Sequence, residues 1–229
     1  MSNSKSVQQT VAREGPLVRG VSRPVVGASK QQTAIVIPDA SSSMAGTKID
    51  EVNAATMALV TELAGPKCRD AFSVGPVYFN STADTLLAPK KATALSPADV
   101  AVPQNLVGGM TNITAGLEVA LALVNQLPAG ELRPICVLMT DGGHNEGPTP
   151  DATATRLKAK ADLLCVAFGA DADMALLQRL ATTPGHALRV ATGADLRTWF
   201  ATIGTTMATA SRTGQTAAAL LGGGGVVRG

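Results

Sequence analysis

The residues best suited to chemistry in this chain are oxygen-bearing side chains that follow an apolar run. Asp39, Ser41 and Ser43 come directly after the apolar residues 33–38 and are spaced two residues apart. Carboxylate and hydroxyl oxygens are hard donors that suit Mg²⁺ or Mn²⁺, and zinc fits poorly because no thiolate or imidazole pair accompanies them. The pattern therefore predicts part of a divalent-cation site.

Two later segments could complete this site. Thr111 follows a glycine pair, and Asp141 follows the apolar run 135–139. In an open parallel sheet, loops that leave the carboxyl ends of strands collect in one crevice, which is where ligands bind. The predicted ligand set leaves the ion incompletely coordinated, so a carboxylate from another molecule could take an open position.

The elements that must position these residues alternate between strands and helices. Residues 49–63 carry apolar side chains at helical spacing, and Gly65 and Pro66 end that pattern. The same reasoning predicts strands at 33–38, 72–79, 134–140, 163–168 and 187–191, a short edge strand at 85–87, and helices at 113–124, 151–161, 173–181 and 194–210. Ser96 and Pro97 are typical of a helix start. This order predicts an α/β fold with a doubly wound, mostly parallel central sheet flanked by helices.

The sequence predicts a single domain with two tails. Residues 1–32 form a basic arm with little periodicity, residues 33–210 form the domain, and residues 211–229 form an Ala/Gly-rich tail. The arm fits either a solvated tail or a segment that docks on a partner, and both tails are candidates for mediating assembly. The number of subunits is not fixed by the sequence.

Composition excludes several classes of function. The 229 residues are 45% hydrophobic, enough for one sizeable core, and only 3% aromatic, so no platform for stacking bases is evident. A formal charge of +2 is too small to indicate nucleic-acid binding. No run is long enough to cross a membrane, and no signal peptide is evident at the start. Cys68, Cys136 and Cys165 lack metal-ligand spacing and favour a reducing compartment, so we expect a cytoplasmic protein.

Together, these motifs resemble the von Willebrand factor A (vWA) domain, a Rossmann-like fold with a metal-ion-dependent adhesion site. That site uses Asp-x-Ser-x-Ser, a Thr and an Asp, which match Asp39, Ser41, Ser43, Thr111 and Asp141 over roughly residues 32–210. The resemblance implies that the serines and the threonine bind Mg²⁺ directly or through water, that the aspartates often bind through water, and that an acidic residue of a partner completes the shell.

Within this family, residues 44–53 resemble the bacterial intracellular branch typified by the tellurite-resistance TerY proteins. The resemblance implies a role in a bacterial stress or tellurite-resistance signalling complex. Two residues depart from the family pattern, because Ser42 and Met110 stand where glycine is common. Since glycine adopts backbone angles that other residues resist, either departure is expected to tighten its loop or to reduce metal affinity.

Two other functions compete with the favoured non-enzymatic binding module. The first is a Mg²⁺-dependent phosphotransferase with Asp39 as nucleophile, as in haloacid-dehalogenase-type phosphatases. Those enzymes carry a second Asp two residues later, where this chain has Ser41, which cannot act as acid and base near neutral pH. The second is a structural subunit with an empty site. His144 lies close to Asp141 but is predicted to be a polar loop histidine, and Asn80 and Ser81 either border the crevice or form a turn.

Overall fold

The computed structural model describes residues 30–66, 68, 70–213 and 221, and its centre is a seven-stranded sheet. The strand order is β3-β2-β1-β5-β6-β7, with β4 also paired to β2. Strands β2, β1, β5, β6 and β7 run parallel, whereas β3 and β4 are antiparallel to β2. The strands are β1 (Gln32–Pro38), β2 (Phe72–Phe79), β3 (Ala83–Thr85), β4 (Lys90–Lys91), β5 (Leu132–Thr140), β6 (Asp162–Phe168) and β7 (Ala187–Val190).

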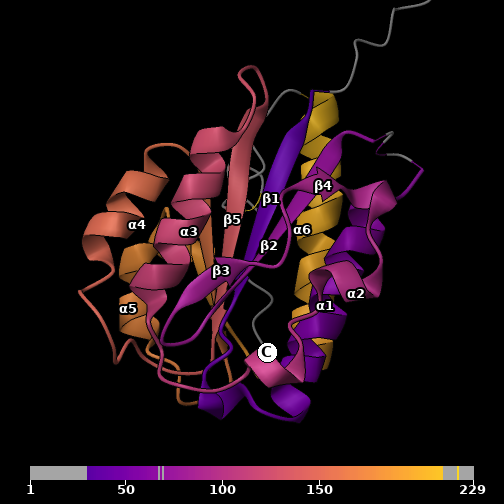
Figure 1. Cartoon of the computed structure of the whole chain (residues 1–229). Helices are drawn as coiled ribbons and strands as arrows, with labels where there is room; N and C mark the ends of the chain where they lie inside the picture. Colours follow the sequence, from indigo (N-terminus) through magenta and orange to yellow (C-terminus); the bar gives the residue numbers. More distant parts are fainter. Residues whose placement is uncertain (1–29, 67, 69, 214–220, 222–229) are drawn as a thin grey trace, which may run out of the picture.

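Helices cover both faces of this sheet, as Figure 1 shows. Helices α1 and α6 lie together on one face, and α3, α4 and α5 lie on the other. The α-helices are α1 (Thr47–Leu63), α2 (Pro97–Val100), α3 (Ile113–Gln126), α4 (Asp151–Lys158), α5 (Met174–Leu180) and α6 (Gly193–Thr213). The 3₁₀ turns are η1 (Ser42–Met44), η2 (Ala92–Ala94), η3 (Gln104–Leu106) and η4 (Pro184–His186). The predicted doubly wound, mostly parallel α/β fold is confirmed.

Side-chain alternation along β1 feeds two separate cores. Ala34 and Val36 belong to the core under α1 and α6, whereas Ile35 and Ile37 belong to the core under α3, α4 and α5. Successive side chains of a strand point to opposite faces, so an uninterrupted apolar run is what a strand covered on both faces requires. This burial holds the carboxyl end of β1, and therefore Asp39, in a fixed position.

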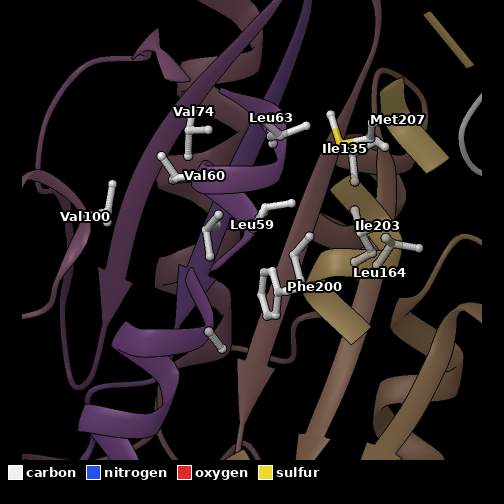
Figure 2. Packing of buried hydrophobic residues seen from close by; sticks show 14 of the residues in the cluster. Leu59, Val60, Leu63, Val74, Val100, Ile135, Leu164, Phe200, Ile203 and Met207 are labelled. Atoms are coloured by element: carbon white, nitrogen blue, oxygen red, sulfur yellow. The ribbon is translucent and has the colours of Figure 1, made fainter. Parts of the chain in front are cut away.

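The core under α1 and α6 is shown in Figure 2. Leu59 and Leu63 of α1 meet Phe200 and Ile203 of α6 above the sheet. Phe200 is fully buried, and Trp199 packs edge-on against it with ring centroids 5.5 Å apart. These two aromatic residues anchor α6 to the sheet.

Some element boundaries differ from the sequence prediction. The edge strand was expected at 85–87 but lies at Ala83–Thr85, because its register on β2 pairs Ala83 with Phe79. Helix α4 ends at Lys158 because the Arg133 guanidinium takes the carbonyl oxygens of Lys158, Ala159 and Ala161. The first difference depends on the register of a local hairpin, and the second depends on a contact between segments distant in sequence.

Strand β1 and helix α6 extend by a few residues into the segments predicted to be tails. Gln32, assigned to the N-terminal arm, is the first residue of β1. Residues 211–213, assigned to the C-terminal tail, continue α6, where the Thr213 hydroxyl donates to the carbonyl of Thr209. The rest of both predicted tails, apart from Lys30, Gln31 and Leu221, lies outside the described residues.

Two further findings concern the membrane and the cysteines. Among the helices described, none combines the length and apolar character needed to cross a bilayer. Cys68, Cys136 and Cys165 are all buried, and Cys136 and Cys165 are free thiols. Burial raises the pKa of Cys136 and of Cys165 well above the usual range for a thiol, so both act as apolar core residues rather than nucleophiles.

Candidate metal centre

Three loops converge where the winding of the sheet reverses. Strands β1 and β5 are parallel neighbours, and the Asp39 amide donates to the Met139 carbonyl at 2.8 Å. The chain leaves β1 toward α1 on one face and leaves β5 toward α4 on the other, so the loops after these strands separate. This separation creates the crevice in which open α/β sheets bind ligands.

Asp39 is held rigidly at the end of β1. Its side chain is fully buried, and its two oxygens accept hydrogen bonds from the Ser41 amide at 2.7 Å and from the Thr140 hydroxyl at 2.6 Å. Such geometry suits a fixed ligand or a second-sphere acceptor better than a nucleophile that must reach a substrate. Thr140 was not assigned a role from the sequence, because only the β1–β5 pairing places it beside Asp39.

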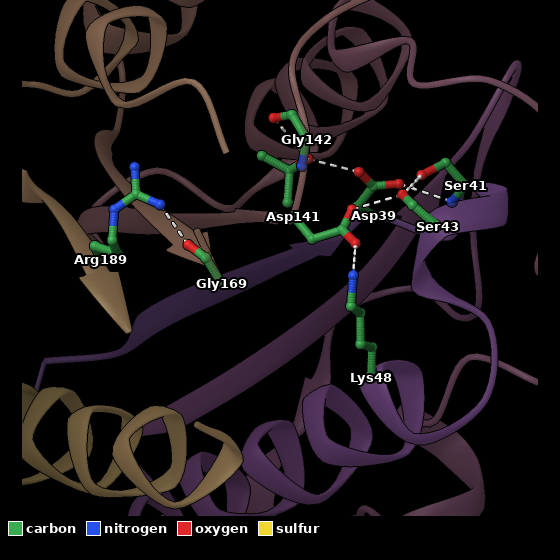
Figure 3. A network of polar contacts seen from close by, with 9 residues as sticks. Asp39, Ser41, Ser43, Lys48, Asp141, Gly142, Gly169 and Arg189 are labelled. Atoms are coloured by element: carbon green, nitrogen blue, oxygen red, sulfur yellow. Dashed lines mark hydrogen bonds and ion pairs between the residues drawn. The ribbon is translucent and has the colours of Figure 1, made fainter. Parts of the chain in front are cut away.

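Asp141 joins the serine loop to α1, as Figure 3 shows. The Ser43 hydroxyl donates to one oxygen of Asp141 at 2.6 Å, and the Lys48 ammonium donates to the other at 2.5 Å. The hydroxyls of Ser41 and Ser43 lie 3.2 Å apart. The structure thus brings four of the five predicted site residues into one hydrogen-bonded network.

The fifth predicted residue, Thr111, lies on a loop bonded to the other two. The Thr111 amide donates to the side-chain oxygen of Asn145 at 2.8 Å, and the Asn145 amide donates to the Thr111 carbonyl at 3.1 Å. The Gly108 amide donates to the Ala40 carbonyl at 2.8 Å. Thr111 is buried, and its hydroxyl makes no hydrogen bond within the described part of the chain.

Electrostatics in this cluster favour a bound cation. Burial, with a smaller contribution from the nearby charge of Asp141, raises the pKa of Asp39 to about 6, although hydrogen bonds from Thr140 and Ser41 oppose the shift. Two carboxylates and two hydroxyls in one network form an all-oxygen donor set, which fits a small divalent cation. When bound, such an ion would offset the cost of keeping negative charge in a buried place.

The comparisons with known proteins agree with this fold. Residues 35–202 match the model of the von Willebrand factor type A domain, which is most of the chain. The chain belongs to the von Willebrand factor type A domain family.

This vWA domain is similar to several known proteins at low sequence identity. It is 28% identical over 171 residues to inter-alpha-trypsin inhibitor heavy chain H4 of Bos taurus, matching 69% of this chain but 18% of that protein. A von Willebrand factor type A structure from Catenulispora acidiphila has a TM-score of 0.64 and 19% identity, covering 80% of this chain and 43% of that one. The proximal thread matrix protein 1 of mussel byssus, with a zinc-occupied metal-ion-dependent adhesion site, has a TM-score of 0.64 and 23% identity, covering 75% of this chain and 46% of that one.

The two departures from the family pattern do not strain this vWA domain. Asp70 is the sole non-glycine residue of the described chain with a positive φ, so Ser42 and Met110 adopt ordinary backbone angles. Ser42 adds contacts instead, because its amide and its hydroxyl both donate to the Gly109 carbonyl, at 3.1 and 3.0 Å. Met110 is 49% exposed beside Thr111. The expected backbone resistance at these positions is therefore absent.

Three polar residues near the site, Asn80, Ser81 and His144, hold the loops of the vWA domain together. The Asn80 side chain donates to the Leu106 carbonyl at 3.0 Å, and the Ser81 hydroxyl accepts the Met110 amide at 3.0 Å. His144 accepts the Ile113 amide at 3.2 Å and so joins the Asp141 loop to the start of α3. These contacts give all three residues positioning roles around the site.

Gly109 offers a test of how tightly the Thr111 loop is held. Its φ is +78°, and a Cβ there would lie 2.8 Å from the Ser81 hydroxyl oxygen. We expect Gly109→Ala to cost about 2 kcal/mol, from the left-handed backbone and the contact together, and to weaken Mg²⁺ binding. Urea unfolding and calorimetric titration with Mg²⁺ would measure both effects.

Gly130→Ala is the matched control for this substitution. Gly130 also has a positive φ, +92°, but a Cβ added there would meet nothing within 4 Å. It precedes β5, at the end of that strand opposite to Asp141. We expect a loss of about 1 kcal/mol from the backbone angle and unchanged Mg²⁺ affinity. Equal effects of the two substitutions on Mg²⁺ affinity would contradict a positioning role for Gly109.

Proposed function

We propose that this vWA domain is a protein-binding module that grips an acidic side chain of a partner through a divalent cation. Asp39, Ser41, Ser43, Thr111 and Asp141 would hold the ion. The observation that carries the proposal is the hydrogen-bonded network of Asp39, Ser41, Ser43 and Asp141, which joins two segments about a hundred residues apart at the reversal point of the sheet. The ion would supply positive charge for a carboxylate of the partner.

Mg²⁺ is the proposed ion, with Mn²⁺ as the substitute of similar chemistry. The donors are carboxylate and hydroxyl oxygens, and Mg²⁺ keeps several waters when few protein carboxylates bind it. A zinc-occupied site occurs in the related mussel byssus protein, so titration with all three ions belongs in the test. The all-oxygen donor set favours Mg²⁺ and Mn²⁺ over zinc in this chain.

An enzymatic role for Asp39 has less support. A phosphotransferase needs an exposed carboxylate and a nearby acid and base, whereas Asp39 is fully buried and both of its oxygens accept hydrogen bonds. Ser41 stands where the second aspartate of such enzymes would be. Phosphatase turnover that depends on Asp39 would favour that alternative over the binding module.

Isothermal titration calorimetry with Mg²⁺ tests the proposed site directly. We expect the variant Asp39→Ala/Ser41→Ala to bind Mg²⁺ at least roughly tenfold more weakly than the wild type, since both an acidic and a hydroxyl donor are removed. Asp84→Ala is the control, because this exposed carboxylate bonds only to the adjacent Thr85 amide among the described residues. Equal Mg²⁺ binding by the wild type and the double variant would refute the metal site.

The setting of this activity is a further prediction. The resemblance of residues 44–53 to TerY proteins favours a cytoplasmic complex in bacterial stress or tellurite-resistance signalling. A pull-down from the native host with and without chelator would name the partner. We expect at least one protein to be lost when the chelator is present and when Asp39 and Ser41 are substituted. Retention of the same proteins in all three samples would favour the structural-subunit alternative.

A further inference from the structure

Lys48 places a positive charge inside the candidate metal centre. Its ammonium nitrogen lies 2.5 Å from Asp141 Oδ2, while the other oxygen of Asp141 accepts the Ser43 hydroxyl. The Asp141 side chain is 1% exposed and that of Lys48 is 42% exposed. A buried carboxylate of the site is therefore paired with a cation whose stem reaches in from solvent (Figure 3).

The position of Lys48 is not explained by the stability of its helix. It is the second residue of α1, in the turn where the helix dipole favours acidic side chains such as Asp50 and disfavours a cation. Arg189, the other cation in Figure 3, donates instead to the carbonyls of Gly169 and Ala170. Among the described residues, Lys48 is thus the cation that meets the site, and Asp141 is what holds it there.

The charges of the cluster have different consequences with and without this lysine. Ionised Asp39 and Asp141 with Lys48 carry a net charge of −1, so a divalent cation makes the centre +1 and a partner's carboxylate brings it to zero. Without Lys48, the ion alone neutralises the two aspartates, and an incoming carboxylate leaves a net negative charge. Lys48 therefore opposes the metal ion on its own and favours the ion together with an acidic ligand.

We propose that Lys48 is an internal counter-cation that lowers affinity for the metal alone and couples metal binding to binding of an acidic ligand. This inference rests on the proposed function and concerns the regulation of the same site. Because much of its side chain faces solvent, Lys48 can move its ammonium away from Asp141 when the ion binds, without unfolding α1. The domain would then fill its site fully only when a partner's carboxylate is present.

Calorimetric titration with Mg²⁺ in sodium chloride and in sodium acetate of equal ionic strength tests this coupling, with acetate as the carboxylate probe. For the wild type, acetate is expected to strengthen Mg²⁺ binding several-fold. For Lys48→Met, we expect Mg²⁺ affinity in chloride to rise about tenfold and the acetate effect to disappear. Lys48→Arg should behave like the wild type because it keeps the charge.

Two further measurements separate this role from a structural one. Lys160→Met removes a surface lysine that bonds to Asn125 at 2.6 Å, and it controls for the change in net charge. Urea unfolding in chelator should show Lys48→Met less stable than the wild type, because Asp141 loses its partner. A loss of stability without tighter Mg²⁺ binding would mean that Lys48 acts only in packing, and would overturn the inference.

The failure of this inference differs from the failure of the proposed site. Equal Mg²⁺ affinities for the wild type and Lys48→Met, both lost on substitution of Asp39 and Ser41, would overturn the role of Lys48 and leave the site intact. An acetate effect that persists in Lys48→Met would also overturn it. Absence of Mg²⁺ binding in both proteins, or binding that survives substitution of Asp39 and Ser41, would overturn the site itself and the inference with it.

Discussion

Replacing Asp39 with asparagine is expected to stabilise the metal-free protein at neutral pH by about 3 kcal/mol, because burial and the nearby Asp141 raise the pKa of this carboxyl from 3.8 to about 6. Asparagine has the same shape and carries no charge. Its oxygen can accept the Ser41 amide, and its amide can donate to the Thr140 hydroxyl, which in turn can donate to the Gly142 carbonyl. The substitution therefore removes the buried charge while keeping the contacts.

The direction of the pH dependence follows from the raised pKa. A carboxyl whose pKa is higher in the folded protein holds its proton more tightly there than in the unfolded chain. The contribution of Asp39 to stability is therefore greatest below about pH 4, falls as the pH rises from 3.8 to about 6, and stays low above that. Asparagine should be free of this loss, so the advantage of Asp39→Asn should shrink as the pH is lowered toward 4.

Urea unfolding in the presence of chelator at several pH values measures this effect. Asp162→Asn is the matched control, because Asp162 is also buried but is paired with Arg133 at 2.8 Å, so its replacement should destabilise the protein at neutral pH. Added Mg²⁺ should stabilise the wild type and have less effect on Asp39→Asn. If Asp39→Asn is less stable than the wild type throughout the pH range in chelator, the ionised Asp39 carboxylate does not destabilise the folded protein.

The fold was predictable from the sequence because the patterns that indicate its strands and helices are local. The run of residues in β1 is buried throughout, and α1 buries residues at helical spacing from Ile49 to Leu63, as the sequence predicted. The start of α2 was also evident from Ser96 and Pro97, and the structure adds a capping box in which Ser96 and Asp99 satisfy each other. Where an element ended on a distant contact, as α4 does on Arg133, the boundary was wrong.

The clustering of the candidate site residues was predictable from the sequence, but the residues that contact them were not. Spacing within the chain identified Asp39, Ser41 and Ser43, and the order of strands brought Asp141 to the same edge. Lys48 and Thr140 gave no such signal. A lysine in the first turn of a helix usually faces solvent. Its ion pair with Asp141 exists only because the start of α1 lies beside the loop that follows β5. Lys48 and Thr140 reach the candidate site only through tertiary contacts, whereas the candidate ligands follow from spacing within the sequence.

Truncation of Phe79 is expected to be the most damaging single change to both fold and site. Phe79 ends β2 and is fully buried, and its carbonyl accepts the Ala40 amide at 2.7 Å beside Asp39. Helix α3 packs so closely on its ring that a Cβ at Gly116 would lie 2.9 Å from two ring carbons. We expect Phe79→Ala to lower stability by about 3–5 kcal/mol, since the cavity would lie under a helix held by close contact.

Phe200→Ala separates loss of stability from loss of the site. Phe200 is equally buried but lies in the core under α1 and α6, on the opposite face of the sheet. Both substitutions should cost similar stability in urea unfolding, about 3–5 kcal/mol. Below the unfolding transition, only Phe79→Ala should weaken Mg²⁺ binding, because the cavity it leaves lets α3 and the adjoining Thr111 loop shift away from the Asp39 loop. If the two variants bind Mg²⁺ equally well, the close packing of α3 on Phe79 serves the fold alone and the geometry of the metal centre is set by its loops.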